Sequence, residues 1–330
     1  MTLTNAIKNI LSLTANPLTP QEIKALVKEK YPYLYGTVSH ISNVEKGHYK
    51  NLDHALLAQI YTIVKTSSNF FCDESSKPLK VSLKRKELNS RIKNEDDLLS
   101  KLGHYYKRSL DVSKDFGGPS IYFHIQAIKE QETNFISERH IEMIYATLAA
   151  WGMHKMGDPD YTKTKMINYS EFKKSILIHG EELRRLRHIG MHQVSLKDYK
   201  DYIDNLEQIY HNLKVSISES TIVANSKTLA HILPQLVPPI DRQYTVRFFT
   251  QEYKSFFTKK GKYKSVYLPK GISEQFADFK KYCCLIKALF DKCKHQIFTI
   301  DKESFNTSYP KIMDNLIMAF VKDVPKPRAK

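Results

Sequence analysis

The sequence predicts a mainly α-helical protein, in which a smaller N-terminal module precedes a larger helical domain. Apolar residues recur every three to four positions along most of the chain, which is the spacing of one buried helix face. Alternation of apolar and polar residues, which is typical of strands, is confined to residues 69–83. Because 330 residues suffice for two or three domains, we expect a module over residues 1–85, a connector over residues 86–135 and a helical domain over residues 136–330.

Three helices are expected in the N-terminal module. The first ends at Asn16-Pro17, because proline cannot continue a helix. Thr19 is a good N-cap and Pro20 suits the first helical position, so a second helix begins there and ends before Tyr31-Pro32. Residues 51–65 repeat apolar side chains at helical spacing and form the third helix.

A β-hairpin is expected to follow the third helix. Residues 69–72 and 79–83 have strand composition, and the polar segment between them contains Pro78. Three helices followed by a hairpin make a winged helix-turn-helix, and the hairpin is its wing.

Two segments of this module, residues 17–23 and 55–61, resemble the HARE-HTH group of winged helices, an accessory module of DNA-modifying, restriction and chromatin proteins. The resemblance implies that the helix of residues 51–65 enters the major groove and that the wing contacts phosphate. The residues then expected near DNA are Lys50, Asn51, His54 and Lys65 on the helix, Lys77 and Lys80 on the wing, and Lys46 in the basic and aromatic segment before the helix. Winged helices also bind other proteins, and this alternative stays open.

The charge of the chain is unevenly distributed. The net charge is +16, and residues 1–110 carry 17 basic against 10 acidic side chains. Residues 111–239 carry 15 against 16, and residues 240–330 carry 19 against 9. Two basic ends around a neutral middle favour a polyanionic partner, double-stranded DNA, over a uniformly basic surface that serves solubility alone.

We expect a soluble protein of the cytoplasm with no membrane partner. No stretch approaches the roughly 18 apolar residues of a membrane span, and residues 1–8 lack the features of an export signal. The four cysteines are not spaced as zinc or iron–sulfur ligands, which predicts reduced thiols and no cofactor.

Further helices are expected in the rest of the chain. Residues 84–111 have the pattern of a charged helical connector. The Gly-Gly-Pro segment within residues 116–124 predicts a tight turn, and a substrate loop is the alternative. Ser137 is expected to cap a core helix and Ser170 a second one, and residues 198–213 are expected to form a third.

Pro159-Asp160 followed by Glu171 and Lys173 matches the PD-(D/E)xK pattern of metal-dependent nucleases. In that chemistry two carboxylates hold Mg²⁺ and the lysine positions the attacking water. Mg²⁺ is expected only under this hypothesis. The alternative is a solvated loop followed by the start of a helix, since residues 170–178 have a helical pattern rather than that of a strand.

Residues 223–233 and 238–248 resemble the active-site segment of the helix-hairpin-helix (HhH-GPD) DNA glycosylases. The resemblance implies that Lys227 opens a helix and attacks the sugar C1′, and that Asp241 stabilises the developing positive charge or assists proton transfer. In that family a glycine-rich hairpin lies just before the lysine, whereas residues 223–225 of this chain contain no glycine. The alternative is that Ser226 and Asp241 merely cap two helices.

Residues 253–267 alternate basic and aromatic side chains around Gly261, which predicts a loop that neutralises phosphates and stacks unpaired bases, or else a solvated basic loop. The residues of this C-terminal part expected to contact DNA are Arg242, Tyr244, Arg247, Lys259, Lys260, Lys262 and Lys264. The working hypothesis is a protein that processes duplex DNA by glycosylase/lyase-like or restriction-type cleavage, and a homodimer is compatible with it. The alternatives are a non-catalytic DNA-binding regulator or adaptor and a metal-dependent nuclease.

Overall fold

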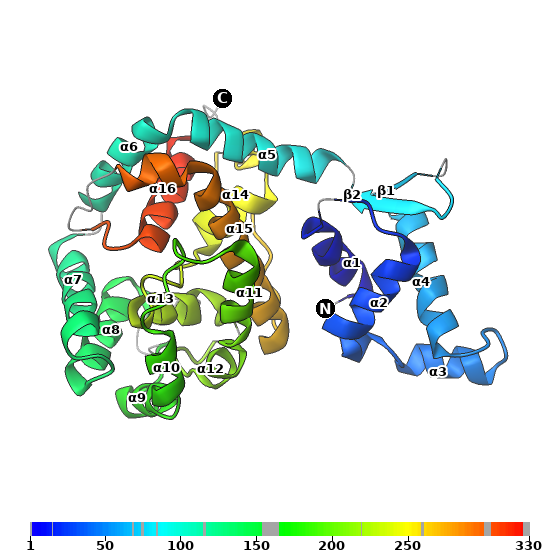
Figure 1. The fold of residues 1–330 in the computed structure, drawn as a ribbon, viewed down its shortest axis with the longest axis horizontal. Helices are drawn as coiled ribbons and strands as arrows, with labels where there is room; N and C mark the ends of the chain where they lie inside the picture. Colours follow the sequence, from blue (N-terminus) through cyan, green and yellow to red (C-terminus); the bar gives the residue numbers. More distant parts are fainter. Residues whose placement is uncertain are drawn as a thin grey trace. The chain divides into compact units, whose positions relative to one another are not determined.

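The structure is a computed structural model that describes residues 2–14, 16–67, 69–73, 76–83, 85–114, 117–153, 165–218, 220–258, 261–299 and 305–325. The chain forms two compact units, Met1–Ile92 and Lys93–Lys330. The fold is mainly α-helical, as predicted, and the described residues contain a single sheet of two strands. Figure 1 shows the helices of each unit.

The elements of the first unit are α1 (Leu3–Ser12), α2 (Pro20–Lys30), η1 (Pro32–Leu34), α3 (Val38–Glu45), α4 (Leu52–Thr66), β1 (Phe70–Asp73), β2 (Lys80–Leu83) and the start of α5 (Arg85–Ser100). The predicted start of α2 is confirmed, because Thr19 and Glu22 form a reciprocal capping box. Helix α3 was not predicted. Its only buried residue is His40, and its apolar residues Val38 and Ile41 are exposed, so this helix does not have the buried apolar face on which the other predictions rested.

Strands β1 and β2 form the predicted hairpin, which is antiparallel with Phe70 opposite Leu83. Leu18, between α1 and α2, adds one further pairing: its N–H donates to Val81 O over 3.0 Å and its carbonyl accepts from Val81 N over 2.7 Å. The hairpin is thus tied to the helices by backbone hydrogen bonds as well as by a shared core. That core contains Ile7, Ile10, Ile23, Leu56, Ile60 and Val81.

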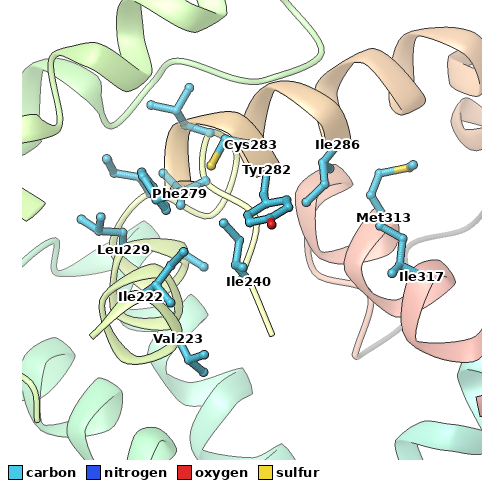
Figure 2. Close-up of a cluster of buried hydrophobic side chains, with 14 of the residues drawn as sticks. Ile222, Val223, Leu229, Ile240, Phe279, Tyr282, Cys283, Ile286, Met313 and Ile317 are labelled. Carbon is cyan, nitrogen blue, oxygen red and sulfur yellow. The ribbon is translucent and has the colours of Figure 1, made fainter. Parts of the chain in front are cut away.

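The second unit contains the end of α5, then α6 (Leu102–Lys114), α7 (Gly117–Thr133), α8 (Glu138–Ala150), α9 (Tyr169–Leu177), α10 (Gly180–Leu186), α11 (Leu196–Asp204), α12 (Glu207–Asn212), α13 (Ile222–Ile232), η3 (Arg242–Val246), α14 (Arg247–Thr250), η4 (Tyr253–Ser255), α15 (Ile272–Phe298) and α16 (Tyr309–Asp323). Figure 2 shows part of its core, in which α13 contributes Ile222 and Leu229, α15 contributes Phe279 and α16 contributes Ile317. Within the described part of the chain, none of the helices is both long and apolar enough to cross a membrane.

Several boundaries in this unit differ from the expectations. The cap of α9 is Asn168, whose side chain accepts from Glu171 N over 3.0 Å, and Ser170 lies inside the helix. The Gly-Gly-Pro segment starts helix α7 instead of forming a tight turn, which is consistent with the tolerance of proline in a first helical turn. The helix expected over residues 198–213 is two helices, because the chain turns at Leu206 and buries that side chain completely.

Residues 86–135, which we expected to act as a connector, form α5, α6 and α7. Helix α6 packs against α16, and α7 packs against α8. On α5, Asn94 is fully buried and its amide donates to the carbonyls of Phe248 and Gln251, each over 2.8 Å. The residues from 93 onward are therefore part of the second unit's packed structure.

Candidate active site and nucleic-acid contacts

Lys227 lies in the middle of α13, which begins five residues earlier at Ile222. The expectation that Lys227 opens a helix is therefore wrong, and so is the alternative that Ser226 caps one. The Ser226 hydroxyl is fully buried and binds the chain on the far side of the turn, where it accepts from Ile240 N over 3.0 Å. This bond holds the residue next to Asp241 against α13.

The first turn of α13 is capped from within the protein. The side-chain oxygen of Gln275 accepts from Thr221 N over 2.7 Å and from Ile222 N over 2.9 Å, and Gln275 is fully buried. A DNA-gripping hairpin would offer backbone N–H groups to phosphate at this point of the sequence. In this chain Gln275 already accepts from both donors, so these two N–H groups are not free to bind phosphate.

Lys227 and Asp241 form an ion pair, although they belong to separate elements. Lys227 Nζ lies 3.3 Å from Asp241 Oδ2, and the two side chains are 13% and 24% exposed. The other carboxylate oxygen of Asp241 accepts from Gln243 N over 2.7 Å, so Asp241 caps η3 as the capping alternative predicted. The amine and the carboxylate are thus adjacent, largely shielded from water, and each still partly exposed.

Trp151, the only tryptophan of the chain, lies close to the lysine of this pair and to the lysine of a second pair. The ammonium of Lys227 is 5.4 Å from the centre of the indole ring, and that of Lys311 is 5.5 Å from it. Lys311 is itself paired with Asp314, with 2.7 Å between Nζ and Oδ2. Sequence reasoning missed Trp151 and Lys311 because no motif links them to Lys227.

Two buried histidines complete this region. His231 Nδ1 is 2.7 Å from the carbonyl of Lys227 and so must donate to it, which leaves Nε2 to accept from His124 Nδ1 over 2.9 Å. Because one ring nitrogen donates and the other accepts, the His231 ring is neutral. Burial, helped by the charges of Lys311 and Lys227, lowers the pKa of His231 to about 4, and burial lowers that of His124 well below its usual value.

A small cavity adjoins these side chains. It is lined by residues that include His124, Trp151, His231, Thr307 and Lys311, and its volume of about 10 Å³ suffices for about one water molecule. The indole N–H of Trp151 is buried and has no hydrogen-bond partner in the part of the chain that the structure describes. The arrangement therefore offers polar groups to a single small ligand atom, and a larger group would need the walls to move.

Arg247 is a correction to the expected set of DNA-binding residues. Its side chain is fully buried and donates five hydrogen bonds, to the backbone and side-chain oxygens of Gln243, to the side chain of Gln251, and to the carbonyls of Phe256 and Lys264. A guanidinium has five N–H donors, so all of them are used within the protein. Arg247 cannot contact phosphate in this structure.

Within the segment expected as a basic loop, residues 256–258 and 261–264 form the two sides of a short hairpin. Thr258 N donates to Lys262 O over 2.7 Å, and the ring of Phe257 stacks on that of Tyr263 with 4.6 Å between centroids. The other expected residues differ in exposure: Arg242, Lys262 and Lys264 are exposed, and Tyr244 is half-buried. Lys259 and Lys260 lie outside the described residues.

The expected DNA-contacting residues of the first unit are all exposed: Lys46, Lys50, Asn51, His54, Lys65, Lys77 and Lys80. Asn51 caps α4, where its side chain accepts from His54 N over 2.9 Å. The acidic residue in the first turn of α4, Asp53, is paired with Lys24 and Lys28. Hydrogen bonds from Lys28, Tyr35 and Lys24 hold its pKa well below the usual value, so this carboxylate stays ionised and paired.

The residues of the nuclease pattern are not assembled into a metal site by the described residues. Glu171 and Lys173 lie on helix α9, and Lys173 forms an ion pair with Glu138. Asp160 lies outside the described residues. Among those the structure describes, no three or more histidine, cysteine or acidic side chains are grouped so that they could hold a metal ion.

Comparisons with known protein families, with curated proteins and with solved structures found no match for this chain. What the protein does is therefore inferred from its own residues. The feature that combines reactive groups, shielding and access is the Lys227–Asp241 pair.

Proposed function

We propose that the protein binds double-stranded DNA and that its second unit removes a base from it, as a DNA glycosylase with lyase activity that uses Lys227 and Asp241. The observation that carries the proposal is the 3.3 Å distance between the Lys227 amine and the Asp241 carboxylate in a largely shielded setting. The excess of basic residues after residue 240 supports a polyanionic substrate at the same unit. This pair favours glycosylase chemistry over restriction-type hydrolysis.

The pair can carry a proton-balanced reaction. Asp241 takes a proton from the Lys227 ammonium, and the neutral amine attacks the sugar C1′. The glycosidic bond breaks with its electron pair on the departing base, which takes the proton from Asp241. One of the two protons then on the Lys227 nitrogen moves to the ring oxygen as the sugar opens, which leaves a protonated Schiff base between Lys227 and C1′.

The first unit is proposed to be a winged helix that targets this chemistry. Its exposed cations, the N-terminus of α4 and the hairpin of β1 and β2 are the features that suit a major groove and its flanking phosphates. The bond between Leu18 and Val81 supports this interpretation, because it ties the hairpin to the helices. The proposal places the protein in the cytoplasm and allows a homodimer on DNA.

Trapping with borohydride tests the chemistry. The full chain is incubated with labelled duplexes that contain an abasic site or a modified base, and hydride reduction should convert the Schiff base into a stable protein–DNA adduct visible on a denaturing gel. Lys227→Ala should abolish the adduct. Asp241→Asn should slow base release by at least about a hundredfold, since it removes the proton acceptor.

The matched control is Lys280→Ala, which removes another ion-paired lysine of the same unit, the partner of Asp204. This variant should trap DNA like the unchanged protein. A normal adduct with Lys227→Ala, or no adduct with any duplex although the protein binds DNA, would reject the proposed reaction.

A second candidate, a non-catalytic DNA-binding adaptor, is favoured by one observation. The cavity beside Trp151 has a volume of only about 10 Å³, so no base fits there without movement of the walls. An adaptor would protect a footprint on DNA and leave every duplex uncut, and Lys227→Ala would bind DNA as the unchanged protein does.

A further inference from the structure

The stretch that follows α14 carries concentrated positive charge. Residues 253–273 contain six lysines and neither aspartate nor glutamate. Of these lysines, Lys254, Lys262 and Lys264 are exposed on the described part of the hairpin or beside it. A basic surface of this kind neutralises phosphates, provided that the chain holds the cations at a defined spacing.

The hairpin is held at its base by a buried cation. Arg247 donates to Phe256 O over 3.2 Å and to Lys264 O over 2.9 Å, so it joins the two sides where they leave the unit. Lys264 N donates to Phe256 O over 2.8 Å, and Gly261 turns the chain in the left-handed region, at φ 70°. The guanidinium also lies 4.5 Å from the centre of the Tyr263 ring.

The same cation connects the hairpin to the reactive pair. Arg247 Nε donates to Gln243 O over 2.9 Å, and Gln243 N donates to Asp241 Oδ1 over 2.7 Å. Asp241 in turn binds Lys227. A chain of hydrogen bonds therefore runs from the amine through Asp241, Gln243 and Arg247 to both sides of the hairpin.

The five acceptors of Arg247 are all uncharged carbonyl or amide oxygens. No carboxylate among them neutralises the guanidinium, so its charge adds to that of the exposed lysines above it. The stacked rings of Phe257 and Tyr263 are used inside the hairpin. What the hairpin offers to a partner is therefore charge at a fixed spacing, which suits a phosphate backbone better than unpaired bases.

We propose that the hairpin sides formed by residues 256–258 and 261–264 are a preorganised phosphate-binding element for duplex DNA, and that Arg247 is the positioning residue that sets them relative to Lys227 and Asp241. The proposal rests on the DNA-binding part of the proposed function. Because the contact is to the backbone, it acts on duplexes of any sequence. A phosphate bound by the hairpin would lie at a constant distance from the Lys227 amine. A constant distance is needed if the enzyme is to bring one particular sugar of the strand to that amine.

The test is the salt dependence of binding to a labelled duplex of random sequence, measured with the full chain by fluorescence anisotropy. Loss of two phosphate contacts in Lys262→Ala/Lys264→Ala should reduce the slope of log K against log salt by about 1.8. The control Lys129→Ala/Lys197→Ala removes the same charge from exposed positions on α7 and α11, and should leave the slope unchanged.

Arg247→Lys keeps the charge but cannot make five hydrogen bonds, and should reduce the slope like the double lysine variant, with about tenfold weaker binding. Gly261→Ala provides a second probe that does not disturb the buried Arg247. It strains the backbone at residue 261, where φ is 70°, and should weaken binding several-fold while the unfolding midpoint stays within a few degrees. The proposal would be overturned if the lysine double variant and Gly261→Ala both bound DNA with the slope and the affinity of the unchanged protein.

Borohydride trapping tests the reaction at Lys227, and the salt dependence of binding tests the hairpin, so the two proposals can fail separately. If no adduct forms but the slope falls as expected, the hairpin binds DNA and the proposed reaction is wrong. If Lys227 is trapped and the slope does not change, the reaction stands and the hairpin proposal is wrong.

Discussion

Two lysine–aspartate pairs face the same indole ring, and they differ in burial and in construction. Lys311 and Asp314 are 2.7 Å apart on one helix, with side chains 8% and 9% exposed. Lys227 and Asp241 are 3.3 Å apart, come from separate elements, and are 13% and 24% exposed. A pair within one helix and away from water is part of the packing. A longer pair that spans two elements and reaches solvent can exchange its partner, which a reacting amine must do.

The largest effect on stability is expected at the more buried pair, Lys311 and Asp314. Lys311→Ala leaves the Asp314 carboxylate buried without its cation, which should lower the free energy of unfolding by about 3–5 kcal/mol in urea denaturation. Lys311→Met/Asp314→Leu removes both charges and should cost far less. A loss below about 1 kcal/mol in the single variant would show that the two pairs are energetically alike.

Buried His231, which donates to the carbonyl of Lys227, should make the free energy of unfolding depend on pH. His231 is neutral in the folded protein with its pKa lowered to about 4, whereas in the unfolded chain it titrates near 6.5. The unfolded state therefore binds more protons as the pH falls from about 6.5 to 4, and stability decreases over that window by up to about 3 kcal/mol from this residue. Above pH 7 the ring is neutral in both states, so none of this stability is lost there.

The measurement is the free energy of unfolding at pH 7 and pH 5 for the unchanged protein and for His231→Gln. The variant should lose about 2 kcal/mol less than the unchanged protein between these two values, because it has no ring to protonate. Equal losses would mean that His231 already carries a proton in the folded protein, and the hydrogen-bond directions assigned to it would be wrong.

The smallest effect on stability is expected at the more exposed pair, Lys227 and Asp241. In Lys227→Ala, Asp241 keeps the hydrogen bond from Gln243 N and is 24% exposed, so water can replace the lost cation. The free energy of unfolding should fall by about 1 kcal/mol or less, well below the loss for Lys311→Ala. A loss as large as that of Lys311→Ala would make Lys227 a structural residue and weaken its assignment as a nucleophile.

Local chemistry explains which elements could be predicted. The start of α2 follows from Thr19, Pro20 and Glu22, and the start of α8 from Ser137, whose side chain accepts from His140 N. The start of α9 was misplaced because Asn168 and Ser170 are both good caps, and the tertiary packing around Phe172 decides between them. Helix α3 was missed because it exposes Val38 and Ile41 and buries a histidine.

The candidate site was predictable only in part. Lys227 and Asp241 lie on one recognisable segment, and the sequence indicated both. Trp151 and Lys311 are far from that segment in the chain, and only the packing of α8, α13 and α16 brings them to it. Arg247 was expected to contact DNA, but its side chain is fully buried and the five oxygens around it stabilise it in the interior.

By itself the sequence determined what depends on neighbours along the chain: the helical character, several helix caps, the hairpin and the separation of charge into two basic ends. Only the tertiary structure decided which charged groups are buried, paired or exposed, since burial and pairing depend on contacts between distant segments. That is why Arg247 and Lys227, both basic residues near Asp241, have such different surroundings. The first is enclosed by carbonyl oxygens, and the second keeps a carboxylate beside it and a path to solvent.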